Sequence, residues 1–214
     1  MAKNESMKLW WANLAKEQTV DKFDMAEDAN RLIEKSDEKG KKEIIEYLTR
    51  VAVEKKEDYA IALKVLETHC TPRCLRAIYE KARSLNPARS DIADYLRVLG
   101  QQGAKEYRHL LEDYLLNGPL NENHQIVQWS TYPKFPKLFA KAYSRFLIET
   151  NYKRWTGSAI VEAFMDCPEA LKVLKAYLEK KNKDVWLKLR ADLQEKIKSE
   201  IWDKECNRRI EAIL

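Results

Sequence analysis

Glycine and proline divide this chain more sharply than any other residue type. The 214 residues include only five glycines and six prolines, and each stands where a helical hydrophobic pattern starts or stops. Glycine weakens a helix, and proline lacks the backbone N–H that a helix interior needs. The segments between them are rich in good helix formers, with apolar residues three and four positions apart. This arrangement predicts an all-α protein of many short packed helices, since no segment alternates as a strand would.

The expected helix boundaries follow from these breaks. Asp21 is a suitable N-cap, and Thr71-Pro72 is typical of an N-cap followed by the first helical residue. Asn86-Pro87 and Cys167-Pro168 repeat that arrangement, and Asp184 is expected to cap the last helix. We therefore expect about ten helices, near residues 5–17, 21–35, 41–55, 58–70, 107–117 and 134–150, with others opened by Pro72, Pro87, Pro168 and Asp184. Gly40, Gly100 and Gly103 are expected in turns between them.

One segment interrupts this regular order. Residues 118–133 show no clear helical period, and a long loop inside a helical protein is often functional or mobile. The sequence therefore predicts a single helical domain over 1–214. Helical repeats fill 1–117, an irregular loop spans 118–133, and further helices fill 134–214.

The segment after this loop concentrates aromatic and basic residues. Between Trp129 and Trp155 it carries six basic residues and the single acid Glu149, so its excess of positive charge equals the net charge of +5 of the whole chain. The basic residues are Lys134, Lys137, Lys141, Arg145, Lys153 and Arg154, with Trp155 beside them. Such a mixture is typical of nucleic-acid platforms, where bases stack and phosphates pair.

Helical geometry separates the two residue types within this segment. At about 100° per residue, Phe135, Phe139, Tyr143 and Phe146 fall on one face, and Lys134, Lys137, Lys141 and Arg145 fall close to the opposite face. The aromatic stripe is therefore expected in the core and the cations on a solvated exterior. The alternative is that the cations form an exposed ridge that binds phosphates or an acidic protein.

The remaining reactive side chains give no site motif. The four cysteines are expected as reduced thiols, because the chain starts without a secretory signal and is long enough for a core. His69, Cys70 and Cys74 lack the second ligand pair that a structural zinc site needs, so we expect no metal. Cys74 is more readily explained as a buried inert thiol than as a thiol activated by a helix start. Carboxylates such as Asp91 and Asp94 are expected on solvated helix faces.

Two segments of similar length support a repeat arrangement. Residues Ile61–Leu85 and Ile92–Leu116 superpose as helix–turn–helix units at an offset of about 31 residues, and Ala62-Leu63-Lys64-Val65-Leu66 recurs as Ala170–Leu174. Residues 41–117 resemble a HEAT-like α-solenoid in period and helix pairing, and 158–212 do so more weakly. That resemblance implies a scaffold whose concave face binds an extended partner.

The expected function follows from this architecture and from the lack of any catalytic, cofactor or nucleotide motif. We expect a cytoplasmic, non-enzymatic scaffold that binds a protein partner through a helical face, for example an immunity or inhibitor protein. No apolar run approaches the roughly 20 residues that span a bilayer, so no membrane partner is expected, nor any cofactor. The alternative is nucleic-acid binding, including the activity of HEAT-like DNA glycosylases, on the basic ridge.

Overall fold

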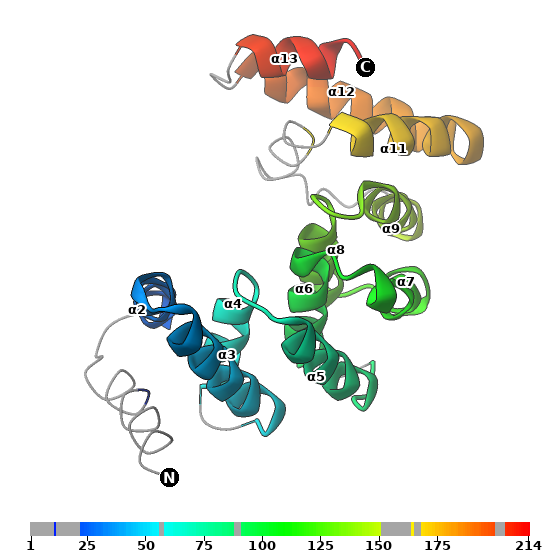
Figure 1. Cartoon of the computed structure of the whole chain (residues 1–214). Coiled ribbons are helices and arrows are strands. Elements are labelled where there is room, and N and C mark those ends of the chain that lie inside the picture. Colours follow the sequence, from blue (N-terminus) through cyan, green and yellow to red (C-terminus); the bar gives the residue numbers. More distant parts are fainter. Residues whose placement is uncertain are drawn as a thin grey trace. The chain divides into compact units, whose positions relative to one another are not determined.

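The described part of the chain is entirely helical in its regular structure. The computed structural model describes residues 11, 22–55, 58–87, 91–150, 164, 168–199 and 204–214. Within these ranges the elements are α-helices and one short 3-10 helix, η1, without any strand (Figure 1). The all-α prediction is therefore confirmed. The chain divides into two compact units, Met1–Arg108 and His109–Leu214, which are described separately.

The helices of the first unit pack mainly on near neighbours in the sequence. They are α2 (Lys22–Lys35), α3 (Glu38–Val53), α4 (Tyr59–Leu66), α5 (Pro72–Arg83), α6 (Ile92–Gln102) and η1 (Lys105–Tyr107). Helix α4 packs on α2 and α6, whereas α3 packs on α5. The consecutive pairs α2–α3, α3–α4 and α5–α6 are also in contact.

Local sequence explains where these helices begin. Asp37 caps α3, because its carboxylate accepts a hydrogen bond from the Gly40 N–H at 2.7 Å. Thr71 caps α5 as predicted, and its hydroxyl oxygen accepts from the Cys74 N–H at 3.2 Å. Pro72 follows at the first helical position, where the missing N–H costs nothing. The apolar face expected for α3 is buried, as a helix with a period of 3.6 residues requires.

The second unit has a core that four of its helices share. Its helices are α7 (Arg108–Asn117), which begins at the last residue of the first unit, α8 (Glu122–Thr131), α9 (Pro136–Glu149), α11 (Pro168–Lys181), α12 (Lys183–Ser199) and α13 (Lys204–Glu211). Helix α9 packs on α8 and α11, and α11 packs on α12. Apolar side chains of α9, α11, α12 and α13, together with Phe164, form one buried cluster.

The prediction of an irregular loop over 118–133 is wrong. Helix α8 occupies most of it, and Asn121 caps that helix by accepting from the His124 N–H at 3.0 Å. The buried positions of α8 include His124, Val127, Gln128 and Thr131, which have helical spacing but are mostly polar. A search for apolar periodicity therefore misses this helix, because its inward face carries imidazole, amide and hydroxyl groups.

Several expected helix boundaries also need correction. Gly40 lies inside the first turn of α3, and Gly100 lies inside the last turn of α6. Pro87 does not open a helix, since α6 begins at Ile92 after Asp91. Asn182 rather than Asp184 caps α12, because its side-chain oxygen accepts from the Val185 N–H at 3.2 Å.

Two glycines are required where helices end. Gly103 follows α6 with φ of 64°, a left-handed conformation that other residues adopt at a cost. Gly118 follows α7, where an added Cβ would lie 2.3 Å from the Tyr114 carbonyl oxygen. Both therefore confirm the expectation that glycines mark helix ends at these positions. No helix in the described ranges is long and apolar enough to cross a bilayer.

Candidate functional site

Only some of the side chains of the basic ridge expected on α9 are exposed. Lys134, Lys137 and Lys141 are exposed, as the helical geometry predicted. Arg145 does not belong to this exposed ridge, because only 18% of its side chain is exposed. The other predicted members, Lys153, Arg154 and Trp155, lie outside the described residues.

Arg145 instead holds the end of α7 against α9. Its Nη1 donates to the Leu115 carbonyl oxygen at 3.0 Å, and its Nη2 donates to the Gly118 carbonyl oxygen at 2.9 Å. Its Nε also donates to Glu149 at 2.9 Å. The last carbonyls of a helix lack partners within the helix, so this guanidinium stabilises the C-terminus of α7.

The aromatic stripe of α9 is core, as predicted. Phe139 is fully buried, and Phe135, Tyr143 and Phe146 are nearly so. The Phe139 ring centroid lies 5.6 Å from that of Trp129, which is only partly buried, and 6.0 Å from that of Phe164. These rings pack against one another in the core, so they cannot also serve as an exposed stacking platform for bases.

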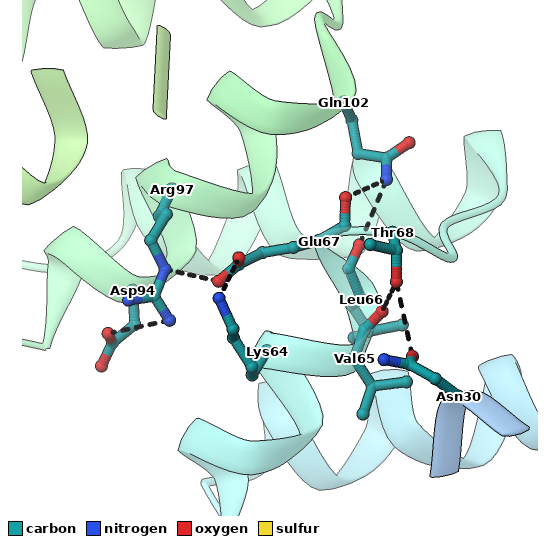
Figure 2. A network of polar contacts seen from close by, with 9 residues as sticks. All are labelled: Asn30, Lys64, Val65, Leu66, Glu67, Thr68, Asp94, Arg97 and Gln102. Carbon is teal, nitrogen blue, oxygen red and sulfur yellow. Dashed lines mark hydrogen bonds and ion pairs between the residues drawn. The ribbon is translucent and has the colours of Figure 1, made fainter. Parts of the chain in front are cut away.

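A charged network in the first unit was not anticipated from the sequence. Glu67 directly follows α4, and only 7% of its side chain is exposed. Arg97 of α6 places its Nε 2.5 Å from Glu67 Oε1, while Lys64 places its Nζ 3.0 Å from Oε2 (Figure 2). Two cations therefore compensate one buried carboxylate, as a buried charge requires.

Polar contacts around Glu67 extend to the neighbouring helices. The Gln102 side-chain amide donates to the Glu67 carbonyl oxygen at 2.6 Å, which ties the end of α6 to the end of α4 (Figure 2). The Thr68 hydroxyl lies 3.4 Å from Asn30 Oδ1 on α2. The network therefore joins α2, α4 and α6, and α4 packs on both of the other two helices.

Two carboxylates at the start of α6 belong to the same region, contrary to the expectation of solvated faces. Asp91 is buried and pairs with Lys55. Burial raises the pKa of Asp94, and the nearby Glu67 charge raises it further, against the lowering effects of Arg97 and Lys55. Asp94 also forms an ion pair with Arg97 at 3.9 Å. The sequence signal was weak, since acids and bases three positions apart are common on solvated helices.

The second unit contains a buried histidine on α8. His124 is fully buried, and its Nε2 donates to the Leu115 carbonyl oxygen at 2.9 Å. Its Nδ1 has no hydrogen-bond partner in the described residues. Burial lowers the pKa of His124, and this outweighs the raising effect of the hydrogen bond to Leu115; the nearby Arg145 charge lowers it and Glu149 raises it. The ring is therefore held neutral, with its proton on Nε2.

The cysteine expectation is corrected at two positions. The sulfurs of Cys70 and Cys74 are joined as a disulfide, with Cα atoms 5.6 Å apart. The chain turns between α4 and α5 at Thr71-Pro72, and this turn brings the two residues together. Cys74 is therefore a half-cystine rather than an inert or activated thiol. Cys167 lies outside the described residues.

Comparison with known proteins does not assign this chain to a family. No family model matches it, and the searches of curated proteins and of solved structures find no match either. In the ranges that the structure describes, no group of three or more His, Cys, Asp or Glu side chains could hold a metal ion.

Proposed function

We propose that this chain is a non-enzymatic binding protein that recognises a macromolecular partner through exposed helix faces. The observation that carries the proposal is that some charged side chains are paired between helices while others are exposed to solvent. Glu67, Arg97 and Arg145 tie helices together, whereas Lys137 and Lys141 on α9, and Lys134 just before it, are exposed. Charges held between helices position the scaffold, and exposed charges are available to a partner.

The packing order of the first unit supports a scaffold of stacked helix pairs. Helices α2, α4 and α6 contact one another in series, and α3 contacts α5. A HEAT-like array stacks its helix pairs in two such series. We therefore propose a HEAT-like or irregular solenoid arrangement for this unit.

A protein partner is the first candidate, and a small immunity or inhibitor protein is one concrete form. The test is isolation of the full chain from its natural source under gentle conditions. One partner protein is expected in a stoichiometric complex, and it should be lost from the Lys137→Glu/Lys141→Glu variant. Lys188→Glu/Lys198→Glu is the matched control, because both lysines are exposed on α12. A monomer with no partner, or equal loss from both variants, would contradict the proposal.

Nucleic-acid binding is the second candidate, and the exposed lysines of α9 favour it. Lys137 and Lys141 stand about one helical turn apart on α9, and Lys134 comes just before that helix. Phosphate contacts make binding sensitive to salt. Duplex DNA and RNA should bind less tightly as salt rises, and Lys137→Glu/Lys141→Glu should abolish this binding. Release of alkylated bases from DNA is the assay for a glycosylase activity, and a blank result would discard that activity.

A further inference from the structure

A second cationic surface lies on α5 and η1 in the first unit, and it contains two partly buried tyrosine rings. It consists of Arg76, Tyr79 and Arg83 on α5 and Tyr107 on η1, and we call it the arginine–tyrosine face. The Tyr79 and Tyr107 rings are stacked, with centroids 4.5 Å apart and planes 18° from parallel. Both tyrosines are only partly buried, unlike the aromatic core of α9.

Helical geometry places the α5 members of this face together. Arg76 and Arg83 stand three residues before and four residues after Tyr79, so they flank it on the same side of the helix. Both arginines are exposed. The buried positions Cys74, Ile78 and Ala82 lie toward one side of α5, and Tyr79 stands between them and the two arginines. Arg76 and Arg83 are therefore directed away from the core of their unit.

The local charge of the surface is positive. In the ranges that the structure describes, no ion pair of Arg76 is found, and the ion pair of Arg83 is a long contact of 3.9 Å to Glu80. Lys105, next to Tyr107 on η1, is also exposed. Glu80 and Glu106 are the acids on these two elements, so the basic side chains are in excess.

We propose that the arginine–tyrosine face binds single-stranded nucleic acid. A base stacks on the accessible part of the tyrosine pair, and Arg76 and Arg83 contact phosphates on either side of it. Seven residues of helix separate the two guanidinium-bearing positions by about 10 Å, which is about three steps along a B-form strand at 3.4 Å each. The inference rests on the proposed function, because it treats a helix face as a binding surface, and it names the partner of that face.

The aromatic pair is what favours a nucleic acid over an acidic protein segment. Arginines alone would attract either polyanion, but stacking on tyrosine needs flat bases, and every base presents such a face. Bases in a duplex are already stacked on one another, so a single strand is the form that can use the rings. An acidic polypeptide gains only the charge contacts.

The experiment measures binding of the full chain to a fluorescent 15-residue oligothymidylate by anisotropy at several salt concentrations. Arg76→Gln/Arg83→Gln should weaken binding at least tenfold and reduce the salt slope by about 1.4, because each lost phosphate contact on a single strand contributes about 0.7. Tyr107→Leu should weaken binding roughly 5- to 150-fold with the slope unchanged, since one stacked base is lost. Tyr107→Phe keeps the ring and should bind normally.

The controls separate this surface from a general loss of positive charge and from the proposed function. Lys188→Gln/Lys198→Gln removes the same charge from exposed positions on α12 and should leave oligothymidylate binding unchanged. Circular dichroism of each variant checks that it is folded. No binding by the wild-type chain, equal loss from the control, or equal competition by polyglutamate would overturn the inference. A stoichiometric protein partner could still be retained in that case, so failure here would leave the proposed function standing.

Discussion

Arg97 and Glu67 form a buried ion pair between α6 and the residue that follows α4, with Nε and Oε1 2.5 Å apart. Lys64 pairs with the other carboxylate oxygen, so the carboxylate is compensated on both sides. Taking charges out of water is costly unless such partners are present. The pair therefore makes the packing of α4 on α6 sensitive to the loss of either residue.

Replacing Arg97 with methionine should lower the free energy of unfolding by about 3 kcal/mol, because it leaves a buried carboxylate with less compensation. Glu67→Leu/Arg97→Met removes both charges and should cost less than Arg97→Met alone. Urea unfolding followed by circular dichroism measures both variants. The single variant Glu67→Leu completes the comparison. If the double variant lost as much unfolding free energy as the two single variants together, the residues would not be coupled.

Removing the Arg145 side chain should also affect stability rather than binding alone. Arg145→Met loses two charged hydrogen bonds to the carbonyls that end α7, and such bonds are worth about 1.5–3 kcal/mol each when their partners stay buried. We expect a loss of about 2 kcal/mol or more in unfolding free energy. Lys141→Met, on the exposed side of the same helix, should change it by about 0.5 kcal/mol or less. Equal effects in urea titrations would place Arg145 on the surface with the lysines.

The buried His124 should make the protein less stable in mild acid. Its folded-state pKa is lowered from 6.5, so the unfolded chain takes up a proton at this position before the folded chain does. The unfolded state then binds more protons, and the free energy of unfolding falls as the pH drops below about 6.5. Protonation of Nδ1 in the folded state would bury a charge without a partner.

Thermal melting between pH 5 and pH 8 measures this dependence. His124→Asn should flatten the fall in melting temperature below pH 6.5, whereas His109→Gln, at an exposed position, should keep it. The same fall in wild type and in His124→Asn would assign the acid sensitivity to other groups.

Sequence patterns predicted the parts of the fold in which apolar side chains do the packing. The buried face of α3 and the aromatic stripe of α9 follow from spacing alone. Helix α8 was missed because its buried positions hold polar side chains such as His124 and Gln128, which an apolar pattern does not count. Glu67 was missed for a related reason, since Arg97, one of the two cations that compensate it, is 30 positions away. Charges that find partners in distant helices leave no local periodicity, and this is also why Arg145 was assigned to a solvated ridge.

The Cys70–Cys74 disulfide gives the last prediction. It closes a short loop between α4 and α5, and for a loop of this size the loss of chain entropy in the unfolded state is worth about 2 kcal/mol at 25 °C. Dithiothreitol should therefore lower the unfolding free energy of wild type by about that amount. Cys70→Ser should be less stable than the oxidised wild type and should not respond to the reductant. Iodoacetamide should label Cys70 and Cys74 only after reduction, as peptide mapping by mass spectrometry would show. Labelling of both residues in the unreduced native protein would mean that they are thiols, and the effect of the reductant would then be absent as well.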